Sequence, residues 1–239
     1  GCMNEGFIST ELGLPGIPAA AEDVMVPRNV SLAELTGTRL HLAHISTAGS
    51  VRMVREAKSR GIKVTAEACP HHFTLTEEVV RGFNTLAKMN PPLRTWQDVQ
   101  AIKDGLRDGT IDVIATDHAP HATQEKQQGF TEAPFGIVGL ETALPLTLAL
   151  VEEGILSLES AVEKLSTAPA RAFGLAKGTL AVGADADVVL IDPQAQWEVD
   201  PGKFRSKSRI TPFAGWKVKG LVLTTFVRGR VVFEAPVSA

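Results

Sequence analysis

Short apolar segments alternate with amphipathic helical patterns over residues 1–176, and this alternation constrains the fold more than any other feature. Segments 39–45, 63–68 and 112–116 have the length and apolar content of buried strands. The helical patterns between them include one that begins at Thr95, with Asp98 three residues on as in a capping box. Strands joined by helices form parallel sheets. The sequence therefore predicts an α/β protein, either part of a βα barrel or an open sheet.

The pattern changes after residue 176. Glycines and aspartates punctuate residues 177–187, and an apolar strand is predicted over 188–191. Segments 218–228 and 230–233 then form a predicted β-hairpin that turns at Gly229. We expect two domains: a partial barrel over 1–176 and a small β-rich domain over 177–239.

Composition excludes several classes of protein. The formal net charge is −3, so no basic surface for nucleic acid is expected. The most apolar long window, 139–156, contains three glutamates, and no window suits a membrane helix. No basic and apolar leader opens the sequence, and its two cysteines cannot form a disulfide framework. We therefore expect a cytoplasmic protein without membrane or nucleic-acid partners.

Two predicted strands run directly into side chains that can carry chemistry. His44 lies near the end of the strand over 39–45, and Asp117 follows the strand over 112–116 with His118 beside it. In βα barrels the functional side chains lie at the carboxyl ends of strands. A carboxylate at the end of a strand can bind zinc and can also transfer a proton during the reaction. The alternatives are a histidine bonded within the core and an aspartate that caps a turn.

Three further segments are less specific. Cys69, His71 and His72 look like a metal cluster but lack the paired ligand spacing of a zinc site, so we expect a strand-end turn with the cysteine in the core. Asn90 precedes two prolines, which would hold its amide in a fixed position. Segment 122–135 is polar, and we expect a mobile loop that is either a lid or a simple connection.

Together these segments resemble the amidohydrolase superfamily, and within it the dihydroorotases of the longer bacterial type (type I). The resemblance extends over nearly the whole chain, and the order of the segments makes it specific. The matching segments are 3–6 (MNEG), 41–47 (HLAHIST), 65–72 (TAEACPHH), 88–94 (KMNPPLR), 114–121 (IATDHAPH), 135–142 (FGIVGLET), 168–171 (APAR), 177–178 (KG) and 183–187 (GADAD).

The resemblance implies a fold and an activity. The fold would be the carboxyl-terminal part of a (β/α)8 TIM barrel with a small β-sandwich composite domain. The reaction would be the reversible interconversion of N-carbamoyl-L-aspartate and L-dihydroorotate in pyrimidine biosynthesis, with one or two zinc ions in the complete enzyme. The partners would be this small-molecule substrate and, we expect, further copies of the chain in a homo-oligomer.

The resemblance also implies residue roles. His44 would be a zinc ligand on strand six of the barrel, and Asp117 a zinc ligand on strand eight and the general acid/base. Asn90 and His121 would hold the substrate, whose carboxylate suits His121. The backbone of Phe135 and Gly136 would contact the substrate ring.

One departure from the family is large. The family's His-x-His pair, its bridging Lys or Asp and its His-Ala-Glu segment have no counterpart in this sequence. The chain is therefore expected to be a carboxyl-terminal portion whose partner is the missing amino-terminal half of the barrel, and to be incomplete alone. Two alternatives remain: an allantoinase or hydantoinase, and a non-catalytic dihydroorotase-like subunit. Asn90 and His121 favour dihydroorotase, because both suit a substrate with a carboxylate.

Overall fold

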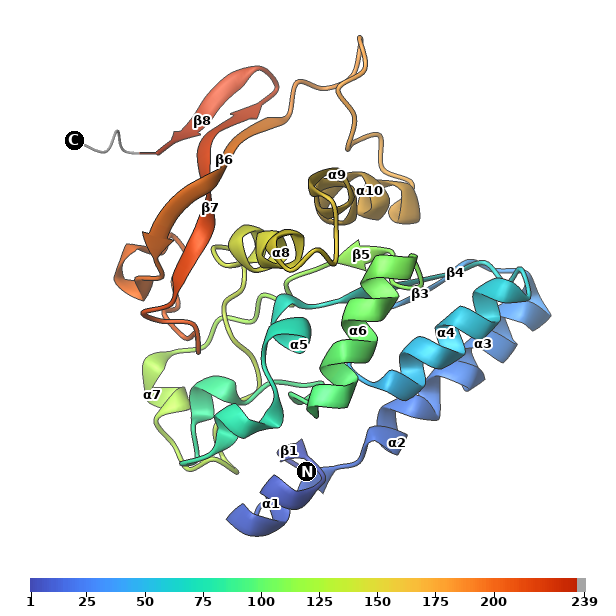
Figure 1. Cartoon of the computed structure of the whole chain (residues 1–239), viewed down its shortest axis with the longest axis vertical. Coiled ribbons are helices and arrows are strands. Elements are labelled where there is room, and N and C mark those ends of the chain that lie inside the picture. Colours follow the sequence, from blue (N-terminus) through green and yellow to red (C-terminus); the bar gives the residue numbers. More distant parts are fainter. Residues whose placement is uncertain (236–239) are drawn as a thin grey trace.

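The predicted α/β class is confirmed in the computed structural model, which describes residues 1–235. A parallel sheet of order β3-β4-β5 lies at its centre (Figure 1). Its pairing aligns Leu40 with Val64 and Glu67 with Val113. All three strands fall within the segments predicted from the sequence. They are β3 (Leu40–Leu42), β4 (Val64–Ala68) and β5 (Val113–Ile114).

Three helices lie side by side against this sheet (Figure 1). They are α3 (Met25–Thr36), α4 (Ala48–Ser59) and α6 (Trp96–Asp108). The predicted capping box is present, because the Thr95 side chain accepts from the Asp98 backbone and Asp98 accepts from Thr95. The inner faces of α4 and α6 are buried, with Val54 and Ile102 both fully enclosed. This helix layer supplies much of the core behind the sheet.

Shorter elements surround the sheet. At the amino end, α1 (Phe7–Leu12) joins two parallel strands, β1 (Met3–Asn4) and β2 (Gly16–Ile17), and α2 (Ala19–Asp23) follows. Between β4 and α6 the chain forms α5 (Pro70–Thr74) and two 3-10 turns, η1 (Glu77–Val80) and η2 (Thr85–Ala87). A single helical turn, α7 (Thr123–Lys126), lies in the long loop after β5.

The helices that follow end the first part of the chain. They are α8 (Ala143–Glu152), α9 (Leu158–Val162), the π-helical turn η3 (Glu163–Thr167) and α10 (Ala168–Phe173). The helix type changes between η3 and α10, and Pro169 falls in the first turn of α10, where no intrahelical donor is needed. Among residues 1–235, no helix has the length and apolar character required to cross a membrane.

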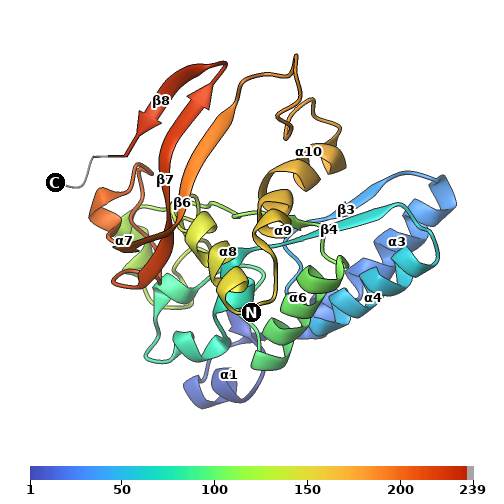
Figure 2. The same cartoon turned by 45° about the horizontal axis from the view of Figure 1, so that its top comes forward.

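An antiparallel sheet of order β6-β7-β8 forms the last part of the structure. Figure 2 shows the connecting segment after α10 leading into it. Its elements are β6 (Val188–Glu198), η4 (Pro201–Lys203), β7 (Lys217–Val227) and β8 (Arg230–Glu234). The predicted turn at Gly229 is confirmed, with φ of 49° at Arg228 and 74° at Gly229. β6 extends beyond the predicted 188–191 because a register shift between Asp192 and Gln196 accommodates Pro193.

The second sheet contacts the rest of the molecule through α8, which packs on β7. Gly220 in β7 has φ of 102°, and a Cβ there would lie 2.3 Å from Leu148 Cδ1. A glycine is therefore required where the strand meets the helix.

Candidate functional site

The carboxyl ends of the three parallel strands meet at one edge of the sheet, as parallel pairing requires. His44 follows β3, Cys69 follows β4 and Asp117 follows β5. Backbone hydrogen bonds continue past the strands: Ile45 N donates to Glu67 O at 3.0 Å, and Ala115 N to Ala68 O at 3.1 Å. The predicted His44 and Asp117 are thus brought to the same edge, on either side of the central strand.

His44 and Asp117 share an unusual backbone conformation. Their φ angles are 40° and 47°, and they are two of the four non-glycine residues with positive φ in residues 1–235. Such strain collects at functional sites, where the surrounding structure enforces it. Within the described chain, neither the His44 ring nor the Asp117 carboxylate has a hydrogen-bond partner. An imidazole nitrogen and carboxylate oxygens that are free in this way fit the donor set of a zinc ion.

Cys69, His71 and His72 lie between these two residues and are buried. Burial lowers the pKa of His71, and the charges of His72 and His44 lower it further. Burial also raises the pKa of the Cys69 thiol, and the Asp117 carboxylate adds to that rise. His44 and Asp117 are therefore close enough to this turn for their charges to act on it.

The cysteine after β4 lies in the core, as expected, with its side chain fully enclosed. One ligand atom from each of Cys69, His71 and His72 lies within 4.8 Å of the others. The ligand spacing in the sequence is unsuited to a zinc site, but α5, which begins at Pro70, keeps both imidazole rings buried beside the cysteine.

A carboxylate from α2 fixes the turn that follows His44. Glu22 Oε1 accepts from Ser46 N at 2.8 Å, from Thr47 N at 3.2 Å and from Ser50 Oγ at 2.7 Å. The Ser46 hydroxyl also donates to Glu22. Charge-assisted hydrogen bonds of this kind are the stronger ones. They hold the segment that carries His44 in its left-handed conformation.

Arg94 connects this turn to the amino-terminal strands. Its Nη1 donates to Asn4 Oδ1 and to Ile17 O, both at 2.7 Å, and its Nε donates to Ser46 Oγ at 3.2 Å. Its Nη2 lies 3.8 Å from Glu22 Oε2, and its side chain is almost completely buried. Sequence analysis assigned no role to Asn4, Glu22 or Arg94. The only available signal was that Asn4 and Arg94 belong to family-like segments.

Three of the four residues expected to bind substrate are gathered at one place. His121 Nε2 lies 2.7 Å from Phe135 O. Gly136 has φ of 122°, and a Cβ there would lie 2.6 Å from Ala119 Cβ and 3.2 Å from His121 Nε2. The fourth residue, Asn90, is exposed, and no hydrogen bond of the described chain joins it to His121. The absence of a side chain at Gly136 is what allows His121 to reach the Phe135 carbonyl.

Two buried lysines anchor the long loop after β5. Lys126 Nζ donates to the carbonyl oxygens of Thr85, Lys88 and Pro134 at 3.1, 2.9 and 2.8 Å. Lys88 Nζ donates to Phe130 O at 2.6 Å and lies 4.7 Å from the centre of the Phe135 ring. Burial, together with the charge of Lys88, lowers the pKa of Lys126 to about 8. The segment expected to be a mobile loop is thus tied to the segment that carries Asn90.

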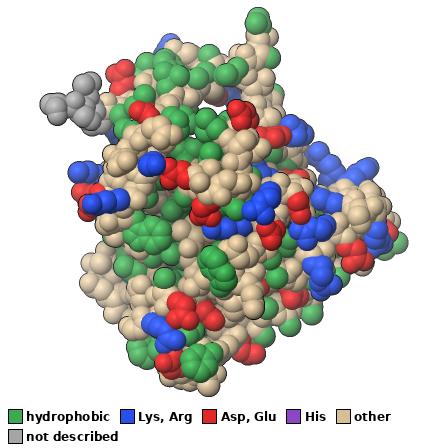
Figure 3. Space-filling model, viewed as in Figure 1, with side chains coloured by type: hydrophobic (Ala, Val, Ile, Leu, Met, Phe, Trp, Pro, Cys, Tyr) green, Lys and Arg blue, Asp and Glu red, His purple; other side chains and the backbone are tan. Residues whose placement is uncertain are grey.

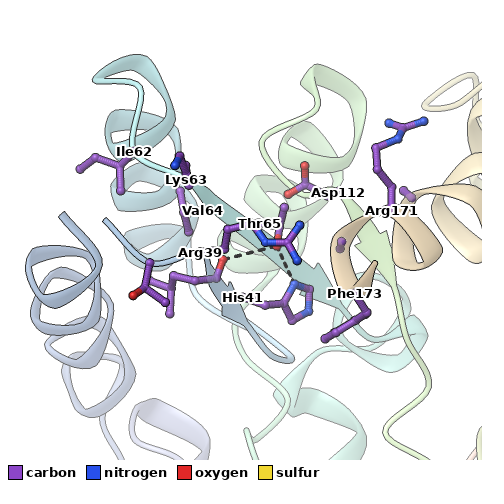
Figure 4. Close-up of a pocket in the computed structure, with 13 residues that line it drawn as sticks. Arg39, His41, Ile62, Lys63, Val64, Thr65, Asp112, Arg171 and Phe173 are labelled. Atoms are coloured by element: carbon purple, nitrogen blue, oxygen red, sulfur yellow. Dashed lines mark hydrogen bonds between the residues drawn. The ribbon is translucent and has the colours of Figure 1, made fainter. Parts of the chain in front are cut away.

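A cavity of about 650 Å³ lies at the opposite end of the sheet (Figure 4). Its lining includes Arg39 at the start of β3, Lys63 before β4 and Asp112 before β5. His41 also lines it, with Nδ1 at 2.8 Å from Thr65 Oγ1 and Nε2 at 2.9 Å from a Glu67 carboxylate oxygen. The cavity is therefore separate from the edge that carries His44 and Asp117.

A helix-covered parallel sheet that presents a histidine and an aspartate at its carboxyl edge defines a class: α/β proteins with candidate metal ligands at their strand ends. Comparison with known families identifies the group within that class. The Amidohydrolase family model matches residues 3–232, and the chain belongs to that family.

The chain is similar to curated proteins named dihydroorotase. It is 60% identical over 235 residues to one from Geobacter sp. (strain M21), covering 98% of this chain and 55% of that protein. It is 56% identical over 234 residues to one from Syntrophus aciditrophicus (strain SB), again covering 98% of this chain and 55% of that protein. The chain thus spans about 55% of the length of the curated relatives it matches.

Solved structures of related enzymes have the same fold over most of this chain. A dihydropyrimidinase from Brevibacillus agri NCHU1002 superposes with a TM-score of 0.86 at 30% identity, covering 91% of this chain and 49% of its own. An L-hydantoinase (dihydropyrimidinase) from Arthrobacter aurescens gives a TM-score of 0.84 at 35% identity, with shares of 89% and 49%.

Proposed function

We propose that this chain is the carboxyl-terminal portion of a zinc-dependent dihydroorotase, which interconverts N-carbamoyl-L-aspartate and L-dihydroorotate in pyrimidine biosynthesis. The observation that carries the proposal is the left-handed backbone of His44 and Asp117, at the ends of β3 and β5. Identities of 56–60% to proteins named dihydroorotase support this substrate over the hydantoin-type rings named for the solved structures, which are 30–35% identical.

The proposal includes the domain organisation. Residues 1–176 would form the last units of a (β/α)8 barrel, and 177–239 a small β-sandwich composite domain. The parallel order β3-β4-β5 and the separate antiparallel order β6-β7-β8 support this division. The remaining barrel units would come from an amino-terminal half, and the assembled protein would be a homo-oligomer.

His44 and Asp117 would hold the zinc through an imidazole nitrogen and a carboxylate oxygen, with the other ligands supplied by the amino-terminal half. A bound zinc ion supplies a polarised ring carbonyl and a more acidic water. The Glu22 carboxylate and Arg94 would keep the His44 backbone in place through the Ser46 turn.

The Asp117 carboxylate would act as the general acid/base. It would accept a proton from the attacking water as the water oxygen bonds to the ring carbonyl carbon. When the carbon–nitrogen bond breaks, Asp117 would return that proton to the leaving nitrogen. Asn90 and His121 would hold the substrate carboxylate, and the backbone of Phe135 and Gly136 would contact the ring. The bond from His121 to the Phe135 carbonyl supports a fixed orientation of that histidine.

We also propose that the protein works in the cytoplasm. Both cysteines, Cys2 and Cys69, are buried and unpaired, which suits a reducing compartment.

The test is reconstitution with the amino-terminal segment of the Geobacter relative. The assembled protein should turn over dihydroorotate, and Asp117→Asn should lower kcat by about 100- to 10,000-fold. Asp104→Asn is the matched control, because Asp104 lies on the exposed side of α6, paired with Arg107. It should leave kcat unchanged.

The same assay separates the alternatives. Preferential turnover of dihydrouracil or hydantoin would support an enzyme of the hydantoinase type. No turnover of any cyclic amide by a well-folded, zinc-loaded assembly would support a non-catalytic subunit. Unchanged turnover in Asp117→Asn would contradict the assigned role.

A further inference from the structure

The turn Cys69–His72 holds three potential metal ligands that the proposed mechanism does not use. The side chain of Cys69 is fully enclosed, and His71 and His72 are each 3% exposed. Their ligand atoms lie within 4.8 Å of one another. Tetrahedral zinc with two nitrogens and one sulfur separates its ligand atoms by about 3.3–3.7 Å. If the three ligand atoms moved about 1 Å closer to one another, they could therefore coordinate one ion.

Both imidazole rings have a nitrogen that nothing in the described chain satisfies. His71 Nε2 and His72 Nδ1 are buried and lack a hydrogen-bond partner. His72 Nε2 lies 2.9 Å from Pro91 O and must donate to it, because a carbonyl oxygen can only accept. Neutral His72 therefore carries its lone pair on Nδ1. Buried polar nitrogens are nearly always hydrogen-bonded or coordinated, so two without a partner in one turn point to a ligand-binding role.

The bonding of His72 is the arrangement found in metal sites. Histidines that bind a metal through one nitrogen usually donate the other N–H to a carbonyl or carboxylate, which fixes the ring. The His71 and His72 rings meet edge to face, with centroids 4.3 Å apart.

We propose that Cys69, His71 and His72 form a second metal site, which takes a thiophilic cation such as Zn²⁺ or Cd²⁺ and is distinct from the His44 and Asp117 pair. One sulfur and two imidazole nitrogens are the donor set that such ions prefer. Binding forms a metal–sulfur bond and releases the Cys69 thiol proton to solvent, with no change of oxidation state. The hydrogen bond from His72 to Pro91 connects this site to the segment that carries Asn90.

The test is titration of the purified, metal-free chain with Cd²⁺, followed by the ultraviolet charge-transfer absorption of the cadmium–thiolate bond. One equivalent of Cd²⁺ should produce the band. Cys69→Ala should abolish it, and His71→Ala should weaken Cd²⁺ binding by about 10- to 100-fold or more. Cys2→Ala is the matched control, because Cys2 is the only other cysteine and is also buried. It should leave the band unchanged.

A double variant, His44→Ala with Asp117→Asn, separates this site from the proposed zinc centre. The thiolate band should persist in that variant. Loss of the band there, or in Cys2→Ala, would overturn the proposal, as would the absence of any band in the unaltered chain. If Cys69→Ala does not fold, as judged by circular dichroism, His72→Gln takes its place and should weaken Cd²⁺ binding to the same extent as His71→Ala. Unchanged binding in both histidine variants would also overturn the proposal.

Discussion

The two larger sheets of this molecule differ in where they place polar groups. The strands of the parallel sheet are short, and β4 alternates buried Val64, Ala66 and Ala68 with half-buried residues. Polar side chains gather at the two ends of its strands: His44 and Asp117 lie at the carboxyl edge, and Arg39, Lys63 and Asp112 line the cavity at the opposite end. The strands β6 and β7 of the antiparallel sheet are longer and largely half-buried or exposed. Exposed hydrophobic side chains cover this sheet and the connecting segment (Figure 3).

The comparison explains why the proposed chemistry is placed at the parallel sheet. Helices and loops surround the edge at His44 and Asp117, so the surroundings can impose strained backbone and orient polar groups. The second sheet, with side chains such as Val231 and Val232 in solvent, lacks that support. In this second sheet, the long pairing of β7 with β6 and β8 determines the shape and does not position reactive groups. Substitutions in the two regions should therefore have very different effects.

The largest contrast is expected from removing apolar side chains. Ile102→Ala in α6 should lower the free energy of unfolding by about 2–5 kcal/mol, because Ile102 is completely buried behind the parallel sheet. Val232→Ala in β8 should cost less than about 0.5 kcal/mol, because Val232 is 59% exposed. Urea unfolding of both variants measures the difference. Equal losses would mean that the second sheet is covered in solution.

Glycine substitutions give the next contrast. Gly136→Ala should cost about 2–4 kcal/mol, because it adds the strain of positive φ to a clash with Ala119. Gly183→Ala in the connecting segment should cost only about 1 kcal/mol, because φ is 90° there but no atom lies within 4 Å of the added Cβ. Thermal unfolding measures both. A milder effect at Gly136 would show that the loop beside His121 can shift.

The smallest contrast concerns lysines. Lys126→Met should cost about 1–3 kcal/mol, because three buried carbonyls lose their donor. Lys219→Met, which breaks a surface pair with Glu152, should cost less than about 1 kcal/mol. Urea unfolding near neutral pH measures the change in the free energy of unfolding of both variants. A loss at Lys126 no larger than that at Lys219 would mean that water replaces the missing ammonium group.

Lys126 should also give the protein a pH dependence. Its pKa is about 8 in the folded state, below the ordinary value of about 10.4 expected when unfolded. Between these values the unfolded chain binds more protons, so stability should rise with pH, by at most about 1.4 kcal/mol per pH unit. Unfolding of wild type and Lys126→Met across this range isolates the effect. A difference in the free energy of unfolding between the two proteins that stays constant with pH would contradict this role of Lys126.

Local patterns were sufficient to predict much of the fold. The three parallel strands, the Thr95 capping box and the hairpin turn at Gly229 all follow from periodicity or from turn and cap chemistry. The positions of His44 and Asp117 at strand ends follow from the same patterns. Their left-handed φ angles do not, because periodicity carries no information on the backbone of a single residue beyond a strand.

Contacts between distant segments could not be predicted from the sequence. Residues 122–135 are polar and were expected to be mobile, yet Lys126 is 2% exposed because carbonyls from the η2 region and from Pro134 receive it. Burial of Arg94 similarly depends on Asn4, which is far away in the sequence. In both cases tertiary hydrogen bonds override a composition that alone indicates exposure.

The left-handed conformation at His44 and Asp117 also limits which residues these positions can hold. Apart from glycine, the residues that adopt positive φ most readily are asparagine, aspartate and histidine. Within that short set, only aspartate is both anionic and able to exchange a proton, and only histidine offers a neutral imidazole. The backbone conformation and the proposed chemistry therefore each restrict, independently, which residues positions 44 and 117 can hold. Most substitutions at either position should therefore either strain the backbone or remove the group that the proposed reaction needs.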